Sequence, residues 1–410
     1  MSSLRLAVVG FAALSVGLPV VFIGAAKFTL LVGALIVLAL ESQTKHRPSA
    51  LSGQWLPIAI LTALAAMALS MLWTSASSGQ AAHALAKHAK LIVIPILVAM
   101  IRSRREALTA LALFAAGQLL LLGGTYLLVL GVPLPWLPTR TPNRIYALFS
   151  TYLDQSIMTA VFAALCWHLR HLIDRPVVRW LPALVAIMAL LCVFFVFQGR
   201  TGHLVAIAMV SLAIMWELPR RWRLLAVLSP VLVLAALNAS SDRIQTRFSL
   251  LQQEVHAFTT DGVINSSSGL RLNLWHRATQ AITERPWVGS GVGSWPVEFN
   301  RLEKQHGADP SVDVGANPHQ EYLLWGVELG ALGLLLLAAI FGAAWRDGRY
   351  AQRDVRRAQH SVLIALGVAA LFNCALYDAL IGDFFCVSLG ILIALGRHTP
   401  AHQIATTGPH

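Results

Sequence analysis

The sequence predicts an all-α polytopic membrane protein with about twelve transmembrane helices and one long hydrophilic loop. Of its 410 residues, 57% are hydrophobic and only 12% are charged, whereas a soluble domain carries roughly 25% charged residues. Apolar runs recur at lengths near that of a membrane-spanning helix, and only helices or closed barrels satisfy their backbone in lipid. A helix bundle of this size is one unit, so residues 1–410 are predicted to form a single transmembrane domain.

Each predicted span is an apolar run bounded by charged or turn-forming residues. The first run follows Arg5 and resembles a signal peptide, but further spans follow at once, which favours a retained helix. The fourth run is short for a complete crossing. The predicted spans lie at 4–23, 28–41, 55–73, 90–101, 106–130, 146–169, 180–197, 203–217, 224–238, 320–345, 361–377 and 380–396.

Basic residues alternate with the spans and predict the orientation. With the N-terminus in the cytoplasm, the inside segments hold eighteen Lys and Arg residues and the short outside segments hold six. Positive charge is retained on the cytoplasmic side, so both termini are predicted to be cytoplasmic. This asymmetry also accounts for the net charge of +12, which therefore indicates contact with membrane lipids and no nucleic acid.

The segment 239–318, between the ninth and tenth predicted spans, is the one long hydrophilic loop. It holds seven Lys and Arg residues against eight Asp and Glu residues, so it is nearly neutral. Helix-like stretches occur at 242–258 and 271–284, and a Gly- and Ser-rich connection lies between them. A loop of this length is usually functional or disordered. Its Trp and Leu content favours an ordered subdomain that folds over the outer mouth of the bundle.

Two arginines and one histidine lie in or beside segments predicted to face the outer side. Arg200 lies in the tight link QGRTGH, Arg271 lies near the start of the helix GLRLNLW, and His319 lies in NPHQEYL at the start of a span. By position alone each is more often an ordinary interface residue than a functional one. Pro318 suits a helix N-terminus, which favours anions and a neutral histidine. Two cations and a base are what an enzyme without a metal needs to hold a diphosphate and deprotonate a hydroxyl.

Two further polar groups are predicted near this outer face. His83, Lys87 and Lys90 are spaced i, i+4 and i+7, which places them on one helical face. A phosphate-binding stripe and an anchor for lipid headgroups explain this spacing equally well. Asp154 lies in a polar patch of the sixth predicted span. A carboxylate is costly in hydrocarbon, so Asp154 is expected to face a cavity or to pair with a cation such as Arg144.

The sequence shows no pattern typical of a metal or nucleotide site. The segment GSGVGSW at 289–295 has GxGxG spacing, but without a preceding strand it is interpreted as a flexible loop. Asp378 and Asp383 are five residues apart with no third carboxylate close in sequence. We interpret both as partners of cations on the outer side, and we expect no metal and no cofactor.

Three segments resemble the O-antigen ligase and polymerase superfamily. PHQEYLLWGVELGALGL (318–334) resembles its PHNxxLxxxxExGxxGL signature, and RLNLWHRATQAITERPWVGSGVGSW (271–295) resembles its R-x3-W-x2-A…P-x2-G-x-G-x-G stretch. QGRTGHLVA (198–206) resembles its SRG or SRT turn before a span. These motifs cover about a fifth of the chain, and their joint occurrence in this order is specific. One departure is Gln320, where the family usually has Asn.

This resemblance implies a metal-independent glycosyltransferase of the GT-C type, acting on the periplasmic side of a Gram-negative inner membrane. The donor would be undecaprenyl-diphosphate-linked O-antigen and the acceptor lipid A–core oligosaccharide. Arg200 and Arg271 would bind the diphosphate, and His319 would be the general base of an inverting transfer. His83, Lys87, Lys90, Arg144, Asp154 and Gln320 are weaker candidates for contacts to the diphosphate or to lipid phosphate.

Two other functions stay open at this stage. The same superfamily contains polymerases that extend the glycan, although the long loop directly before the PHQ signature suits a ligase. A lipid or solute transporter would show two related halves and binding groups near the middle of the membrane. The chain shows no internal repeat, and its ionisable residues concentrate at the outer mouth, which favours an enzyme.

Overall fold

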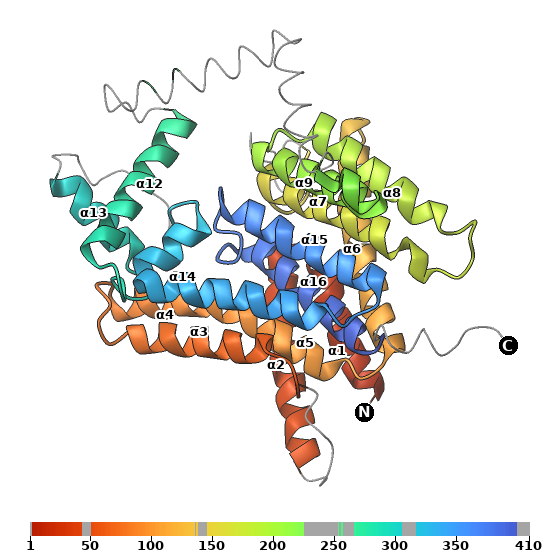
Figure 1. Cartoon of the computed structure of the whole chain (residues 1–410), viewed down its shortest axis with the longest axis horizontal. Coiled ribbons are helices and arrows are strands. Elements are labelled where there is room, and N and C mark those ends of the chain that lie inside the picture. The colour runs from red at the N-terminus through yellow and green to blue at the C-terminus, as the bar shows by residue number, and fades with distance from the viewer. Residues whose placement is uncertain are drawn as a thin grey trace.

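The computed structural model describes residues 2–42, 51–135, 137, 146–224, 253, 256, 266–305 and 317–399. Every regular element in these residues is a helix, which confirms the predicted helical fold (Figure 1). The principal helices are α1 (Ser2–Ser15), α2 (Val20–Ser42), α3 (Leu56–Ser70), α4 (Ser78–His88), α5 (Val93–Met100), α6 (Arg104–Val129), α7 (Tyr152–Leu169), α8 (Trp180–Leu191), α9 (Arg200–Glu217), α12 (Ser267–Glu284), α13 (Trp295–Gln305), α14 (Glu321–Gly348), α15 (Arg353–Ala370) and α16 (Ala379–Arg397).

Five helical segments in the described residues are long and apolar enough to cross a membrane, consistent with a helical membrane protein. Three shorter apolar helices accompany them. The count of twelve spans stays a prediction, and almost all of the ninth, 224–238, lies outside the described residues, as does most of the stretch 242–258. The five segments are Val20–Val37, Ser78–Met100, Arg104–Val129, Glu321–Gly348 and Ala379–Arg397.

Several predicted boundaries differ from the structure, among them the starts of α7 and α15, which lie at 152 and 353 rather than at 146 and 361. Two further differences concern the first and fourth predicted spans. The break between the first two helices falls at residues 16–19 rather than near 24–27. Pro19 explains this, because its ring removes the amide hydrogen that a continuing helix would need. The short fourth span is the second half of a longer segment. α4, the 3₁₀ turn η1 (Ala89–Ile92) and α5 follow one another from Ser78 to Met100, 23 residues, which is long enough to cross.

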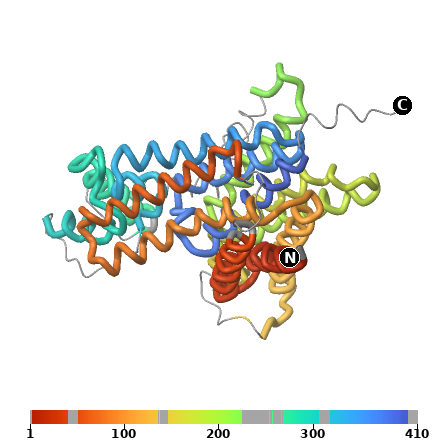
Figure 2. Tube along the Cα trace, turned by 90° about the horizontal axis from the view of Figure 1, so that it is seen from below, coloured from red at the N-terminus to blue at the C-terminus, as the bar shows by residue number. Residues whose placement is uncertain are grey.

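The helices pack in two groups around α15 and α16. α1, α5 and α6 pack against one another or against α16, and α7, α8 and α9 form a second group that contacts α15. Figure 1 shows this second group above α15. In α16, 89% of the span is buried, against 28% in α2, so α16 lies at the centre of the bundle and α2 at its edge. α3 and α14 run side by side (Figure 2).

The pairing of α3 with α14 is fixed at one end by a cap from a distant residue. The first amides of a helix lack partners within the helix. Both oxygens of Asp347, in the last turn of α14, accept from the amide of Trp55 at 2.9 and 3.1 Å, and one accepts from Leu56 at 2.9 Å. The N-terminus of α3 therefore lies against the C-terminus of α14, and the two helices are antiparallel.

At the other end, α14 is interrupted at Gly330, where φ is 60°. The amides of the two residues after Gly330 donate to the carbonyls of Pro286 and Trp287, at 2.7 and 3.2 Å, instead of to the preceding helical turn. The carbonyls freed on that turn accept from Ser290 and Gly291, at 2.8 and 2.9 Å. Residues 286–291 thus replace one turn of hydrogen bonds in α14, and we call this segment the clasp.

The clasp and the four residues after it differ from the flexible loop expected at 289–295. All of residues 289–295 are buried. Gly289, Gly291 and Gly293 have positive φ, and a side chain at Gly289 or Gly291 would meet backbone atoms at 2.4–2.6 Å. Glycine is needed here because only it combines this φ with so close an approach. The GxGxG spacing therefore reflects packing against α14 and against the residues between α3 and α4, and the expectation of a flexible loop is wrong.

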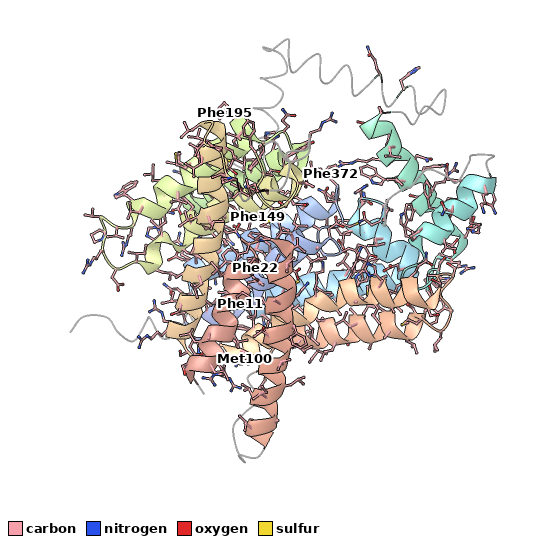
Figure 3. All side chains as sticks on the ribbon, turned by 180° about the vertical axis from the view of Figure 1, so that it is seen from behind. Phe11, Phe22, Met100, Phe149, Phe195 and Phe372 are labelled. Carbon is pink, nitrogen blue, oxygen red and sulfur yellow. The ribbon has the colours of Figure 1, made fainter. Side chains whose placement is uncertain are left out.

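The helices of the hydrophilic loop pack together against the start of α14. α12 contains the predicted stretch 271–284 and begins earlier, because the Ser266 hydroxyl accepts from the amide of Gly269 at 2.9 Å. α13 follows the clasp, and a buried ion pair joins it to α12 through Arg277 and Glu303 at 2.6 Å. α12 also reaches the turn after α15, where Trp275 faces Phe372 with ring centroids 6.4 Å apart (Figure 3).

Candidate active site

Arg200, Arg271 and His319 are brought close enough to interact electrostatically. They come from the N-terminus of α9, the second turn of α12 and the turn before α14. Burial lowers the pKa of Arg271, and the charge of Arg200 lowers it further. Burial also lowers the pKa of His319, and the charge of Arg271 adds to this effect. The three side chains are therefore linked by electrostatic interactions, Arg200 with Arg271 and Arg271 with a histidine that favours its neutral form.

Arg200 is positioned by a close contact between α9 and α7. It is the first residue of α9 and is exposed. A side chain at Gly202 would meet the Ser156 hydroxyl at 2.1 Å, and one at Gly199 would meet it at 2.7 Å. The two glycines of QGRTGH therefore let the first turn of α9 lie directly on α7. This contact fixes Arg200 relative to α7, although the arginine itself remains open to a ligand.

Arg271 extends from α12 toward the start of α7. It is half-buried, and the Tyr152 hydroxyl at the N-terminus of α7 is among the groups that affect its pKa. Because α12 begins at Ser267, Arg271 lies about one turn into the helix rather than at its start. α12 packs on α13 and α14, and these contacts hold the helix that bears Arg271 in place.

His319 lies in a strained turn rather than in the helix. α14 begins at Glu321, so Pro318 does not start the helix as predicted. His319 has φ of 53° and is the only non-glycine residue with positive φ among those described. Its amide donates to Asn317 Oδ1 at 2.9 Å, and Asn317 Nδ2 donates to Asp378 Oδ1 at 2.9 Å. Gln320 is the N-cap residue of α14 but makes no side-chain capping bond.

Asp378 ends the loop between α15 and α16 and lies among cations. Burial raises its pKa, whereas Lys90, Lys87 and the hydrogen bond from Asn317 lower it. Asp383, one turn further along α16, forms an ion pair with Lys27 at 2.9 Å. Asp383 is therefore confirmed as the partner of a cation. The carboxylate of Asp378 instead accepts from the Asn317 amide, and Lys87 and Lys90 act on it only through their charge.

The predicted stripe of His83, Lys87 and Lys90 is not a single surface. The chain tightens into η1 after α4, and Lys90 turns inward, where it is buried. Its ammonium donates to the carbonyls of Tyr377 and Asp378 at 2.9 and 2.6 Å. Lys87 lies over the Tyr377 ring at 4.4 Å, and His83 is exposed. The prediction that the three share one helical face is thus wrong, because the 3₁₀ turn breaks the spacing on which it depended, whereas a contact of Lys90 with phosphate stays a prediction.

Of the predicted pair Asp154 and Arg144, the structure describes only Asp154. Asp154 lies in the first turn of α7 and accepts a hydrogen bond from the Thr151 hydroxyl at 3.0 Å. It is close enough to Asp378 for the two carboxyls to interact. Arg144 lies outside the described residues, so its expected pairing with Asp154 stays a prediction.

Sequence reasoning missed two buried glutamates that support the site. Glu321 accepts from the amides of Leu376 and Tyr377, at 2.8 and 3.3 Å, and so joins the start of α14 to the loop before Asp378. Glu328 accepts from the amide of Gly293 and contacts His88 Nε2, both at 2.8 Å. Both side chains are fully buried. An acidic residue inside an apolar helix is itself a signal, because it needs partners there.

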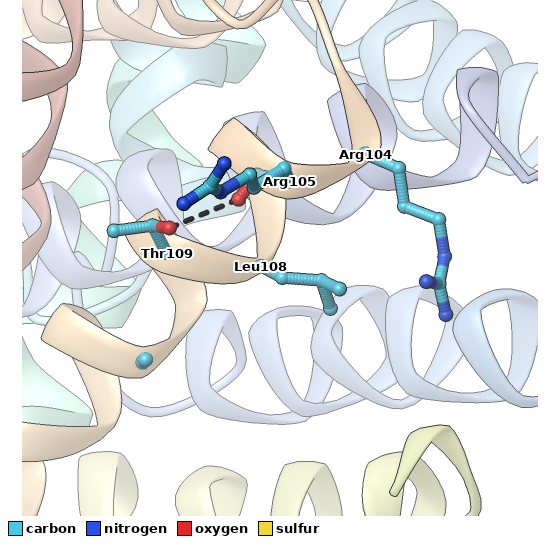
Figure 4. Close-up of a pocket in the computed structure, with 5 residues that line it drawn as sticks. Arg104, Arg105, Leu108 and Thr109 are labelled. Carbon is cyan, nitrogen blue, oxygen red and sulfur yellow. Dashed lines mark hydrogen bonds between the residues drawn. The ribbon is translucent and has the colours of Figure 1, made fainter. Parts of the chain in front are cut away.

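Two cavities lie away from these charges. One, of about 420 Å³, lies between α7, α8 and α9 and is lined almost entirely by apolar side chains, among them Ala163, Ala186, Met209 and Ile214. The cavity lies along the C-terminal half of α9, the helix that begins at Arg200. The other, of about 580 Å³, is an open hollow against the first turns of α6, lined by residues of that helix alone, including Arg104 and Thr109 (Figure 4). Its lining holds no residue of the candidate site.

The described residues thus form a helical bundle with membrane-length helices, in which Arg200 interacts electrostatically with Arg271 and Arg271 with His319. The sequence profile of the O-antigen ligase family matches residues 185–338, a range that includes Arg200, Arg271 and His319. This match confirms the resemblance expected from the three motifs. Members of this family are glycosyl-transfer enzymes, which supports a transferase in general. No curated protein matches the chain.

Proposed function

We propose that the protein is an O-antigen ligase, which transfers O-antigen polysaccharide from undecaprenyl diphosphate to lipid A–core oligosaccharide. The observation that carries this proposal is the grouping of Arg200, Arg271 and His319. They belong to three distant segments of the chain, yet their charges interact. All three lie within the segment that matches the family.

The arginines are proposed to bind the donor diphosphate. The positive charges of Arg200 and Arg271 repel each other, and a bound diphosphate would offset this repulsion by interacting with both. Guanidinium groups bind phosphate oxygens in a bidentate manner. Negative charge grows on the diphosphate as the sugar–oxygen bond breaks, and fixed cations stabilise that charge in the transition state. In this proposal arginine charge takes the role that a metal ion has in other glycosyltransferases.

His319 is proposed to be the general base. Its pKa is lowered by burial and by Arg271, so at neutral pH the imidazole is uncharged and can accept a proton. As the acceptor hydroxyl gives its proton to His319, its oxygen bonds to the anomeric carbon and the diphosphate leaves with the electrons of the broken bond. Direct displacement of this kind inverts the anomeric carbon. The diphosphate is a good leaving group, so no general acid is required.

The lipid parts of both substrates need apolar and charged surfaces near this centre. We propose that part of the polyprenyl chain of the donor lies in the apolar cavity between α7, α8 and α9, because α9 leads from Arg200 to that cavity. Lys87 and His83 are proposed to contact acceptor or headgroup phosphates, and Gln320 to contact substrate beside His319. The active site would face the periplasm in an inner membrane protein with both termini in the cytoplasm.

The test is reconstitution in liposomes with lipid-linked O-antigen and lipid A–core. A ligase yields lipid A–core that carries the glycan, whereas a polymerase, the other activity in this superfamily, yields longer polyprenyl-linked glycan. A deletion strain gives the matching result in cells: a ligase mutant loses the lipopolysaccharide ladder and accumulates long lipid-linked polymer, and a polymerase mutant retains a single-repeat band. Transport of the lipid-linked glycan without new glycosidic bonds would contradict both and favour a transporter.

A further inference from the structure

We infer that Asn317 and Asp378 are positioning residues that hold His319 in its working orientation, an inference that rests on the proposed role of His319 as the base. Neither residue is assigned contact with substrate. Their role is to set the backbone conformation of the turn from which the imidazole projects. The inference depends on four observations: the conformation of His319, the asymmetry of the Asn317 amide, the uncapped state of Asp378 and the ties that fix the loop before it.

The backbone at His319 adopts a conformation that must be enforced. A φ of 53° is uncommon for a residue with a side chain, and such residues persist only where the surroundings over-determine them. The bond from the His319 amide to Asn317 Oδ1, at 2.9 Å, closes the turn in this conformation. Without it, the backbone would be free to relax and the imidazole would change direction.

The orientation of the Asn317 side chain depends on Asp378. An amide has one end that accepts and one that donates, and only the accepting end can bind the His319 amide. An ionised carboxylate can only accept. Asp378 Oδ1, at 2.9 Å, therefore requires the NH₂ of Asn317 on its own side and leaves the carbonyl oxygen facing His319. Asp378 thus fixes which way the amide points.

Asp378 is free for this role because it does not cap its own helix. It occupies the N-cap position of α16, where an aspartate normally accepts from the amides of the first turn. Here the carboxylate makes no capping bond. It faces Asn317 instead, so α16 lacks the side-chain cap that a residue of this type usually supplies. This geometry points to a use for the carboxylate outside its own helix.

Two buried groups hold Asp378 in place. Lys90 donates to the main-chain carbonyl of Asp378 at 2.6 Å. Glu321, two residues after His319, accepts from the amides of Leu376 and Tyr377. The turn of His319 and the loop of Asp378 are therefore joined twice, through Glu321 and through Asn317. The charged or titratable groups that act on Asp378 or lie beside it are Lys87 from α4, Lys90 from η1, Asp154 from α7, Glu321 from α14 and, in its own loop, Cys374 and Tyr377.

An exchange of the two residues tests the inference. Asn317→Asp places two carboxylates face to face with no hydrogen between them, so we expect kcat to fall at least about tenfold, a part of the 10²–10⁴-fold that a general base typically contributes. The double variant Asn317→Asp with Asp378→Asn restores the pattern in reverse. The new carboxylate accepts from both the His319 amide and the new amide, so kcat should rise at least about fivefold above the single variant. The KM for the lipid donor should stay within about twofold throughout, because the arginines bind it.

A matched control uses the other aspartate of the same helix end. Asp383→Asn also removes a carboxylate, but its partner is Lys27 and not Asn317. Combined with Asn317→Asp, it should restore no activity. Each variant is measured as inserted protein, which separates a fall in kcat from a loss of folded enzyme.

Three results would overturn the inference. These are a kcat of Asn317→Asp equal to wild type, a double variant no more active than Asn317→Asp, or equal rescue by Asp383→Asn. If Asn317→Asp fails to insert, Asp378→Asn alone decides: the inference then requires a lowered kcat at unchanged donor KM, and wild-type kcat overturns it. An inactive wild-type protein in the same assay would instead refute the proposed ligase function.

Discussion

Replacement of His319 by glycine tests the catalytic role of its side chain separately from the strained backbone conformation at this position. Because φ at His319 is 53°, glycine fits this position without strain. Residues held in such regions cost on the order of 1–3 kcal/mol, so the variant should be at least as stable as the wild type. A residue that served only the structure of the turn would therefore be replaceable by glycine.

The catalytic loss should be large even though the fold is kept. A general base contributes typically 10²–10⁴-fold, which corresponds to about 2.7–5.4 kcal/mol of activation free energy at 1.36 kcal/mol for each factor of ten. His319→Gly should therefore transfer glycan at about a hundredth of the wild-type rate or less. His319→Gln, which can still donate and accept hydrogen bonds, should be equally impaired. Donor lipid should still bind, because both arginines remain.

The assay is glycan transfer in liposomes, with and without added imidazole. Half-buried His319 leaves a space when its side chain is removed, so free imidazole should partly restore the glycine variant and leave the Arg271→Ala variant inactive. In the wild type, the lowered pKa of His319 predicts activity that is constant at neutral pH and lost as pH falls below the usual histidine range. Transfer by either His319 variant at more than about a tenth of the wild-type rate would refute the base assignment.

Three further predictions test other parts of the proposal. Arg200→Ala and Arg271→Ala should each abolish most transfer while the protein still inserts, and Lys at either position should restore little because it lacks the planar fork; near-wild-type activity of a Lys variant would show that a point charge suffices. Ala186→Phe, which fills the apolar cavity between α7, α8 and α9, should raise the KM for the long-chain donor severalfold but not for a short-chain analogue, and exposed Leu184→Phe on the same helix should do neither; equal effects on both donors would place the chain elsewhere. A reporter fused after Ser266 should be active only outside the cytoplasm, so cytoplasmic activity would reverse the predicted topology.

The sequence by itself determined the helical membrane fold and the three principal candidates. Apolar runs predict helices because lipid leaves the backbone no other partners, and most described helices lie close to the predicted runs. Arg200, Arg271 and His319 were found because charge is rare in such a chain and because each lies in a recognisable motif. These signals are local, so they can be read along the chain without knowledge of what lies beside it.

Only the tertiary structure decided which side chains meet and how the turns are shaped. Lys90 leaves the predicted face because a 3₁₀ turn follows α4, and its new partners are main-chain carbonyls almost three hundred residues away. The glycines of 289–295 contact α14 and the residues after α3, which their GxGxG spacing cannot indicate. Asn317 finds Asp378 across 61 positions. Such contacts depend on packing between segments distant in sequence, and a local pattern carries no information about the distant partner.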